Sequence, residues 1–172
     1  NNLATIDADG FTPLLLKTLS KLAELENISD AEMICQQQMA MSNPDAPNPS
    51  VEALLHAIIP FTWIDHTHAD AVVTLTNTPE GSELIQKIYG ERLLVIPYVM
   101  PGFKLARKVV EITKQVDWRK FEGMVLLNHG IFSFGDTARE SYGRMIELVS
   151  LAENYLAKYS TVANTTAKGS LP

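Results

Sequence analysis

Short segments typical of β-strands alternate with longer segments of helical periodicity along this chain. Residues 61–67 (FTWIDHT) are rich in β-branched and aromatic residues, and residues 93–98 (LLVIPY) and 124–128 (MVLLN) are mostly apolar. Extended structure is expected to continue at 131–134 after an intervening turn. Strands this short must pair with one another and be covered by helices to bury their side chains. The alternation therefore predicts α/β layers around one central sheet.

Helices are predicted around these strands from apolar periodicity and from residues that start or stop helices. Thr12 is a candidate N-cap with Pro13 at the first helical position, and Asp30 is a candidate cap for the second helix. Gly90 occupies the usual position after a helix end, and Pro97 indicates a strand end or an edge strand. The expected helices are 13–22, 31–41, 51–57, 70–76, 81–89, 103–115 and 137–159.

Composition excludes several classes of protein. The 172 residues are enough for one domain with a sizeable core, and 46% hydrophobic and 20% charged residues are typical of a globular protein. A net charge of -6 argues against nucleic-acid and anionic-membrane partners, and no apolar run approaches the roughly 18 residues of a membrane span. The single cysteine, Cys35, is expected to be a small buried thiol. Because one cysteine forms no internal disulfide, we predict a cytoplasmic location.

The two ends of the sequence predict a longer natural protein. Residue 1 is Asn rather than Met. Residues 161–172 (TVANTTAKGSLP) are small and polar, which is typical of a linker or disordered tail. We therefore expect one domain over residues 1–160, truncated at its N-terminus, followed by that tail.

Three of the four histidines occupy positions typical of a metal site. His66 and His68 are two residues apart in a predicted strand and so project from one face, whereas Asp65 faces away. Taken alone, this pair is better explained as two polar residues on an exposed strand face than as a metal site. His129 follows another strand at a turn, where α/β proteins place working residues, although a structural role in the turn is the alternative. Three imidazoles from two strands suit a catalytic zinc site with an open fourth position.

Glu52 is the candidate carboxylate. It lies in the first turn of the predicted helix 51–57, near the positive end of the helix dipole. An acidic residue suits that position for stability alone, and by itself this simpler explanation is favoured. His56 lies one turn later and is expected to pack within the fold, and Ser50 is expected to cap the helix.

Four segments carry a resemblance to a known family: 49–56 (PSVEALLH), 64–70 (IDHTHAD), 95–102 (VIPYVMPG) and 128–136 (NHGIFSFGD). Together they resemble the class II aldolase/adducin family, and most closely the aldolase part of bifunctional rhamnulose-1-phosphate aldolase/alcohol dehydrogenase proteins. The resemblance covers nearly the whole chain. It implies an α/β, three-layer domain whose central, mostly antiparallel β-sheet is flanked by helices.

The resemblance also implies a site. His66, His68 and His129 would bind Zn²⁺, and another divalent transition metal suits the same ligands. Glu52 would be the catalytic acid/base and a metal ligand before substrate arrives. Ser50 is the one match to a substrate-binding position, a phosphate contact. The Gly/Asn/Ser-rich phosphate-binding segment of such enzymes is not found, which is a departure from the family pattern.

The implied activity is that of a lyase. It is the reversible aldol cleavage of a (deoxy)ketose 1-phosphate, such as rhamnulose 1-phosphate, to dihydroxyacetone phosphate and an aldehyde. Two alternatives stay open: a zinc-dependent sugar-phosphate dehydratase or epimerase, and a non-catalytic adducin-like oligomeric interaction module. The resemblance further implies a homotetramer and a C-terminal dehydrogenase domain outside this sequence. NAD is not assigned to this chain, because it has no dinucleotide-binding glycine motif.

Overall fold

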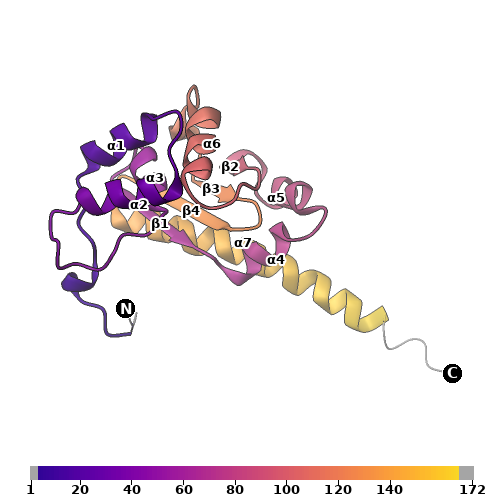
Figure 1. Ribbon diagram of the computed structural model, residues 1–172. Coiled ribbons are helices and arrows are strands. Elements are labelled where there is room, and N and C mark those ends of the chain that lie inside the picture. The colour runs from indigo at the N-terminus through magenta and orange to yellow at the C-terminus, as the bar shows by residue number, and fades with distance from the viewer. Residues whose placement is uncertain (1–3, 167–172) are drawn as a thin grey trace. The chain divides into compact units, whose positions relative to one another are not determined.

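The chain folds into two units, each built from its own secondary-structure elements. The computed structural model (Figure 1) describes residues 4–166. The first unit consists of residues up to 60 and residues 99–116. Its elements are η1 (Ala8–Gly10), α1 (Leu16–Glu24), α2 (Asp30–Met39), α3 (Ala53–Ile58) and α6 (Phe103–Thr113). The second unit consists of residues 61–98 and 117 onward. Its elements are β1 (Trp63–Thr67), α4 (Asp70–Thr76), α5 (Gly81–Tyr89), η2 (Gly90–Arg92), β2 (Leu93–Ile96), η3 (Trp118–Lys120), β3 (Gly123–Leu126), β4 (Gly130–Gly135) and α7 (Ala138–Thr166).

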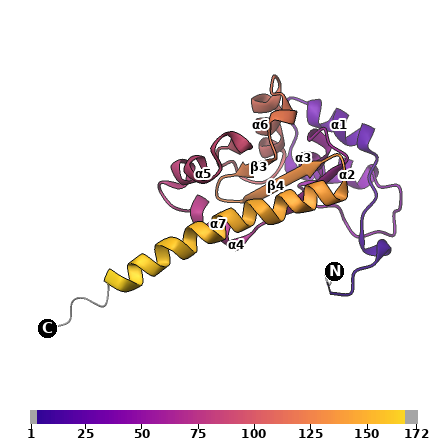
Figure 2. The same cartoon turned by 180° about the vertical axis from the view of Figure 1, so that it is seen from behind.

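A four-stranded sheet forms the centre of the second unit, in the order β1-β4-β3-β2. β4 pairs antiparallel with both β1 and β3, and β2 pairs parallel with β3. The sheet is flanked by helices, and Figure 2 shows α7 running along it. These features confirm the predicted α/β class with a mostly antiparallel sheet.

The core of the second unit lies between the sheet and α4, α5 and α7. Val72 of α4, Ile85 of α5 and Leu148 of α7 are fully buried against Val125 and Ile131 of the two central strands. The alternate residues of β3 and β4 point to the other face of the sheet and are buried as well. Burial on both faces explains why these strands are nearly continuous apolar runs in the sequence.

Tyr89 contributes a buried hydrogen bond to this core, since its hydroxyl donates to the carbonyl oxygen of Leu148 (2.9 Å). Burial raises the pKa of Tyr89 above its ordinary value of about 10. The unfolded chain therefore loses this proton first, and the stability that Tyr89 confers is complete below about pH 10 and falls as pH rises further. We expect Tyr89→Phe to lower the free energy of unfolding by about 0.5–1.5 kcal/mol at pH 7. It should also flatten the decline above pH 10 in denaturant titrations, whereas the exposed Tyr142→Phe should do neither.

The first unit is helical, and α1, α3 and α6 pack against one another. Ser29, rather than the predicted Asp30, caps α2, because its Oγ accepts from the backbone N–H of Glu32 (3.1 Å). Asp30 instead accepts from the backbone N–H of Phe103 (2.8 Å) and so caps the start of α6. Asp30, the predicted cap of α2, thus caps a helix that is distant from it in sequence.

The predicted start of the first helix is wrong. Thr12 and Pro13 are not helical, and α1 begins at Leu16. The Thr12 hydroxyl donates to the carbonyl oxygen of Pro47 (2.5 Å), and the carbonyl of Pro13 accepts from the backbone N–H of Ser42 (3.0 Å). These contacts with the 42–47 loop hold the segment extended before the helix starts.

Other elements follow the predictions more closely. α4 and α5 have the predicted bounds, and Gly90 ends α5 in a left-handed conformation (φ 59°). β2 lies at the sheet edge and stops before Pro97, as that proline indicated. α7 continues to Thr166, beyond the predicted helix end, and the rest of the predicted tail, 167–172, lies outside the described residues.

Cys35 is exposed, which contradicts the predicted buried thiol. α2 turns Met33 and Gln37 inward, one helical turn apart, so Cys35 falls on the outer face. Within residues 4–166, no helix combines the length and apolarity that crossing a membrane requires.

Candidate metal centre

His66 projects from β1 on the opposite side to Asp65. The Asp65 carboxylate accepts from the Ser141 hydroxyl of α7 (2.6 Å), so Asp65 faces that helix. The His66 ring stacks on Phe132 of β4, with ring centroids 4.0 Å apart. This confirms that Asp65 faces away from the histidines, as the strand alternation predicted.

One ring nitrogen of His66 has a fixed role. Nδ1 lies 3.0 Å from the carbonyl oxygen of Ile131. Because a carbonyl only accepts hydrogen bonds, Nδ1 is the donor in this contact, and Nε2 is the nitrogen left for a metal ion. A backbone carbonyl that orients a histidine in this way is typical of metal-binding imidazoles.

The tight connection between β3 and β4 positions His129. Its backbone N–H donates to the carbonyl oxygen of Leu126 (3.2 Å), which closes the turn. Asn128 adopts a left-handed conformation (φ 60°) that few residues other than glycine and asparagine tolerate. Its side-chain amide donates to the amide oxygen of Asn77 at the end of α4 (2.9 Å). The turn is therefore fixed from two sides.

The structure brings His66, His68 and His129 together. Their ring centroids are 4.8 Å apart for His66–His68, 5.5 Å for His66–His129 and 4.8 Å for His68–His129. Each offers one ring nitrogen, and these nitrogens lie within 4.8 Å of one another. Tetrahedral ligands at about 2.0–2.1 Å from a zinc ion lie roughly 3.4 Å apart. Small ring rotations therefore suffice for all three nitrogens to reach one ion, and neutral imidazoles suit Zn²⁺ and its neighbours in the first transition series.

Gly130 makes this close arrangement sterically possible. A Cβ at this position would lie 2.6 Å from the carbonyl oxygen of Thr67, 2.9 Å from the His68 ring and 3.0 Å from the His66 ring. Any side chain would therefore displace the backbone of β1 or the two histidines. The glycine of the Asn-His-Gly segment is the sequence signal for this close approach, and no role was predicted for it from the sequence.

We expect Gly130→Ala to disturb the three-histidine cluster. The added methyl should cost about 1–3 kcal/mol of stability, as overpacking does elsewhere. It should also weaken metal binding, because the added methyl would push the His66 and His68 rings out of their present positions. Gly143→Ala in α7 is the matched control: its Cβ meets nothing within 4 Å, and alanine in a helix is worth about 0.5–1 kcal/mol over glycine. Denaturant unfolding and competitive zinc titration of both variants test the difference.

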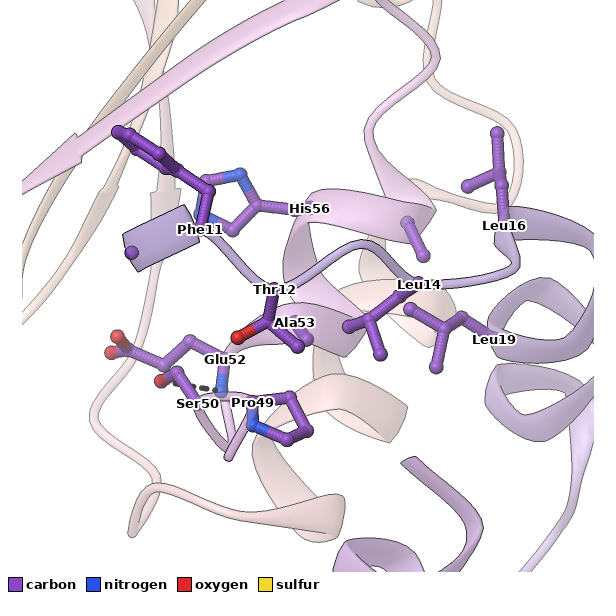
Figure 3. Close-up of a pocket in the computed structure, with 12 residues that line it drawn as sticks. Phe11, Thr12, Leu14, Leu16, Leu19, Pro49, Ser50, Glu52, Ala53 and His56 are labelled. Atoms are coloured by element: carbon purple, nitrogen blue, oxygen red, sulfur yellow. Dashed lines mark hydrogen bonds between the residues drawn. The ribbon is translucent and has the colours of Figure 1, made fainter. Parts of the chain in front are cut away.

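Ser50, Glu52 and His56 lie in the first unit, within α3 or just before it. The predicted capping role of Ser50 is wrong, because α3 begins at Ala53 with Glu52 as its N-cap, and the Ser50 hydroxyl instead accepts from the backbone N–H of Glu52 (3.2 Å) ahead of the helix. All three residues line a cavity of 520 Å³ (Figure 3). His56 is half-buried, and its predicted packing role stays a prediction. Because Glu52 and the histidines belong to different units, the joint role of Glu52 with a metal stays a prediction.

Known proteins similar to this chain point to one family. Residues 12–156 match the family described as Class II Aldolase and Adducin N-terminal domain. The N-terminal class II aldolase domain of a conserved protein from Thermoplasma acidophilum is 41% identical with a TM-score of 0.81, over 91% of this chain and 71% of that chain. An aldolase II superfamily protein from Pseudomonas syringae is similar in fold, with a TM-score of 0.55 and 15% identity over 71% of this chain and 51% of that chain.

A longer relative is the "Uncharacterized oxidoreductase YuxG" of Bacillus subtilis (strain 168). It is 33% identical over 157 residues, which is 91% of this chain but 22% of that protein. The chain therefore spans about a fifth of the length of this relative. Because the family match extends over most of the sequence, the chain belongs to the class II aldolase and adducin family.

Proposed function

We propose that this chain is a metal-dependent aldolase. Its reaction would be the reversible cleavage of a (deoxy)ketose 1-phosphate, such as rhamnulose 1-phosphate, to dihydroxyacetone phosphate and an aldehyde. The observation that carries the proposal is the convergence of three histidine ring nitrogens within 4.8 Å. Family membership supports it, since the cluster falls within the matched residues 12–156.

His66, His68 and His129 would hold the ion, with Zn²⁺ favoured over other divalent transition metals. When bound, the ion would supply Lewis-acid polarisation of the ketose carbonyl. The hydrogen bond from His66 Nδ1 to Ile131 orients that imidazole and leaves Nε2 as the nitrogen for the ion. The tight turn at Asn128 positions His129, and the absence of a side chain at Gly130 leaves room for the rings of His66 and His68.

Glu52 would carry the proton transfer. In the cleavage direction the C4 hydroxyl gives its proton to water, the C3–C4 bond breaks, and the electron pair of that bond stays on C3. Glu52, protonated from water, then delivers a proton to C3, which completes dihydroxyacetone phosphate and leaves the Glu52 carboxylate. In the synthetic direction its carboxylate removes the same proton. The position of Glu52 beside a 520 Å³ cavity supports this role, because such a cavity can admit a small sugar.

The wider assignments are also proposals. We infer a cytoplasmic homotetramer and, in the full-length protein, a C-terminal dehydrogenase domain. The length of the Bacillus subtilis relative and its name as an oxidoreductase support that fusion. A dehydratase or epimerase of the same family would use the same histidines, and an adducin-like module would use none of them.

Metal content and cleavage together test the proposal. Protein purified without chelator or polyhistidine tag should contain about one zinc or similar ion per chain by elemental analysis. It should release dihydroxyacetone phosphate from rhamnulose 1-phosphate, stop after chelation, and recover with added zinc. Bound metal without cleavage of ketose 1-phosphates would favour the dehydratase or epimerase. No metal after zinc loading would favour the non-catalytic module.

A further inference from the structure

Helix α4 links the two segments of the second unit that carry His68 and His129. It begins at Asp70, two residues after His68, and ends at Thr76. The next residue, Asn77, contacts the turn that carries His129, because its amide oxygen accepts from the side-chain amide of Asn128 (2.9 Å). The chain therefore runs from one histidine of the cluster, through a short helix, to a hydrogen bond beside another.

The core and the next helix hold the end of α4 in place. Val72 of α4 is fully buried in the core of the second unit. The backbone N–H of Asn77 donates to the carbonyl oxygen of Val73 (2.9 Å). Gly81, the first residue of α5, approaches so closely that a Cβ there would lie 2.6 Å from the carbonyl oxygen of Thr76. The side chain of Asn77 therefore extends from a fixed backbone position.

The turn on the other side of this hydrogen bond has an unusual backbone conformation. Asn128 is the one residue other than glycine with a positive φ in the part of the chain that the structure describes. Such a conformation persists where the surrounding contacts determine it. The direction of the His129 side chain depends on the backbone of Asn128, since the two residues are adjacent. A contact that fixes Asn128 therefore also fixes where the His129 ring lies.

We propose that Asn77 is a positioning residue for the metal centre. Through α4 and Asn128, it keeps the turn that carries His129 in place relative to His68. The inference rests on the proposed function in one respect, because it takes the three-histidine cluster as the metal site. Hydrogen bonds that orient metal ligands typically change metal affinity by about 10–100-fold. Asn77 acts through the backbone of the turn, so we expect an effect of about 10-fold, at the lower end of that range.

Single variants of Asn77 test the proposal by zinc affinity. Asn77 is exposed, so its replacement should leave the fold intact. Asn77→Ala removes the accepting oxygen and should raise the zinc dissociation constant about 10-fold in competition with a zinc-binding dye. Asn77→Asp keeps an accepting oxygen and should bind zinc at least as tightly as the unchanged protein. Asn154→Ala on the exposed face of α7 is the matched control and should have no effect.

A double-mutant cycle separates positioning from other effects of the substitution. Asn128→Gly removes the amide donor and retains a residue that readily adopts a positive φ. In this background Asn77→Ala should cause no further loss of zinc affinity, because the hydrogen bond between the two side chains is already absent. Losses that add fully, or an unchanged zinc affinity in Asn77→Ala alone, would overturn the inference.

Amide hydrogen exchange of the metal-free protein gives a readout that involves no zinc. The backbone N–H of His129, which donates to Leu126, should exchange about 2–10-fold faster in Asn77→Ala. The N–H of Val125 in β3 should keep its rate. If zinc affinity depends on Asn77 but no ketose phosphate is cleaved, the proposed function fails and the positioning role stands. If cleavage occurs and Asn77→Ala matches the unchanged protein in affinity and exchange, the positioning role fails and the function stands.

Discussion

Replacing His129 with alanine is expected to abolish tight metal binding. His66 lies in β1 and His68 directly follows that strand. Two imidazoles alone leave a divalent ion with too few protein ligands for a stable tetrahedral site. Loss of a group that merely supports a metal ligand typically costs about 10–100-fold in affinity, so loss of a ligand should cost more. Competitive titration with a zinc-binding dye and elemental analysis after dialysis both report the effect.

The fourth histidine provides the matched control for this prediction. His56 is not one of the proposed ligands, so His56→Ala removes an imidazole without removing a metal ligand. Its zinc content should equal that of the unchanged protein. If His129→Ala also retains its full zinc content, the assignment of the three histidines as the metal site is wrong.

The histidine cluster was accessible from sequence because strand geometry is local and periodic. The two-residue spacing predicted His66 and His68 on one side of a strand and Asp65 on the other. The two rings do lie together, 4.8 Å between centroids, although β1 ends at Thr67, one residue before His68. The proximity of His129 to the other two histidines depends on tertiary structure. In the sequence, only the position of His129 at the end of a strand indicated it. The structure adds that a Cβ at position 130 would collide with both rings, and that the carbonyl of Ile131 contacts His66.

Helix starts were harder to predict, because capping residues have competing uses. Thr12 and Asp30 are both good N-caps by type, yet Thr12 bonds to Pro47 and Asp30 caps α6. Both partners are distant in sequence, and periodicity carries no information about them. The cavity beside Glu52 was missed for the same reason, since it combines the segment before α1 with the start of α3.

Glu52→Gln is expected to retain metal and lose turnover. The glutamine keeps the size of the side chain and the backbone N–H that donates to Ser50, so α3 should start unchanged. It cannot accept or deliver the proton on C3, and loss of a general acid/base costs about 10²–10⁴-fold in rate.

Proton exchange gives the sharper test of Glu52. In deuterated water the zinc-loaded protein should exchange the carbon-bound proton of dihydroxyacetone phosphate that Glu52 removes, without any aldehyde present. Glu52→Gln should lose this exchange and cleavage together, whereas Glu24→Gln, an exposed acid at the end of α1, should keep both. Exchange that survives in Glu52→Gln would assign the proton transfer to another group. Loss of zinc in this variant would instead mean that Glu52 contributes mainly as a ligand, so metal content must be measured on the same samples.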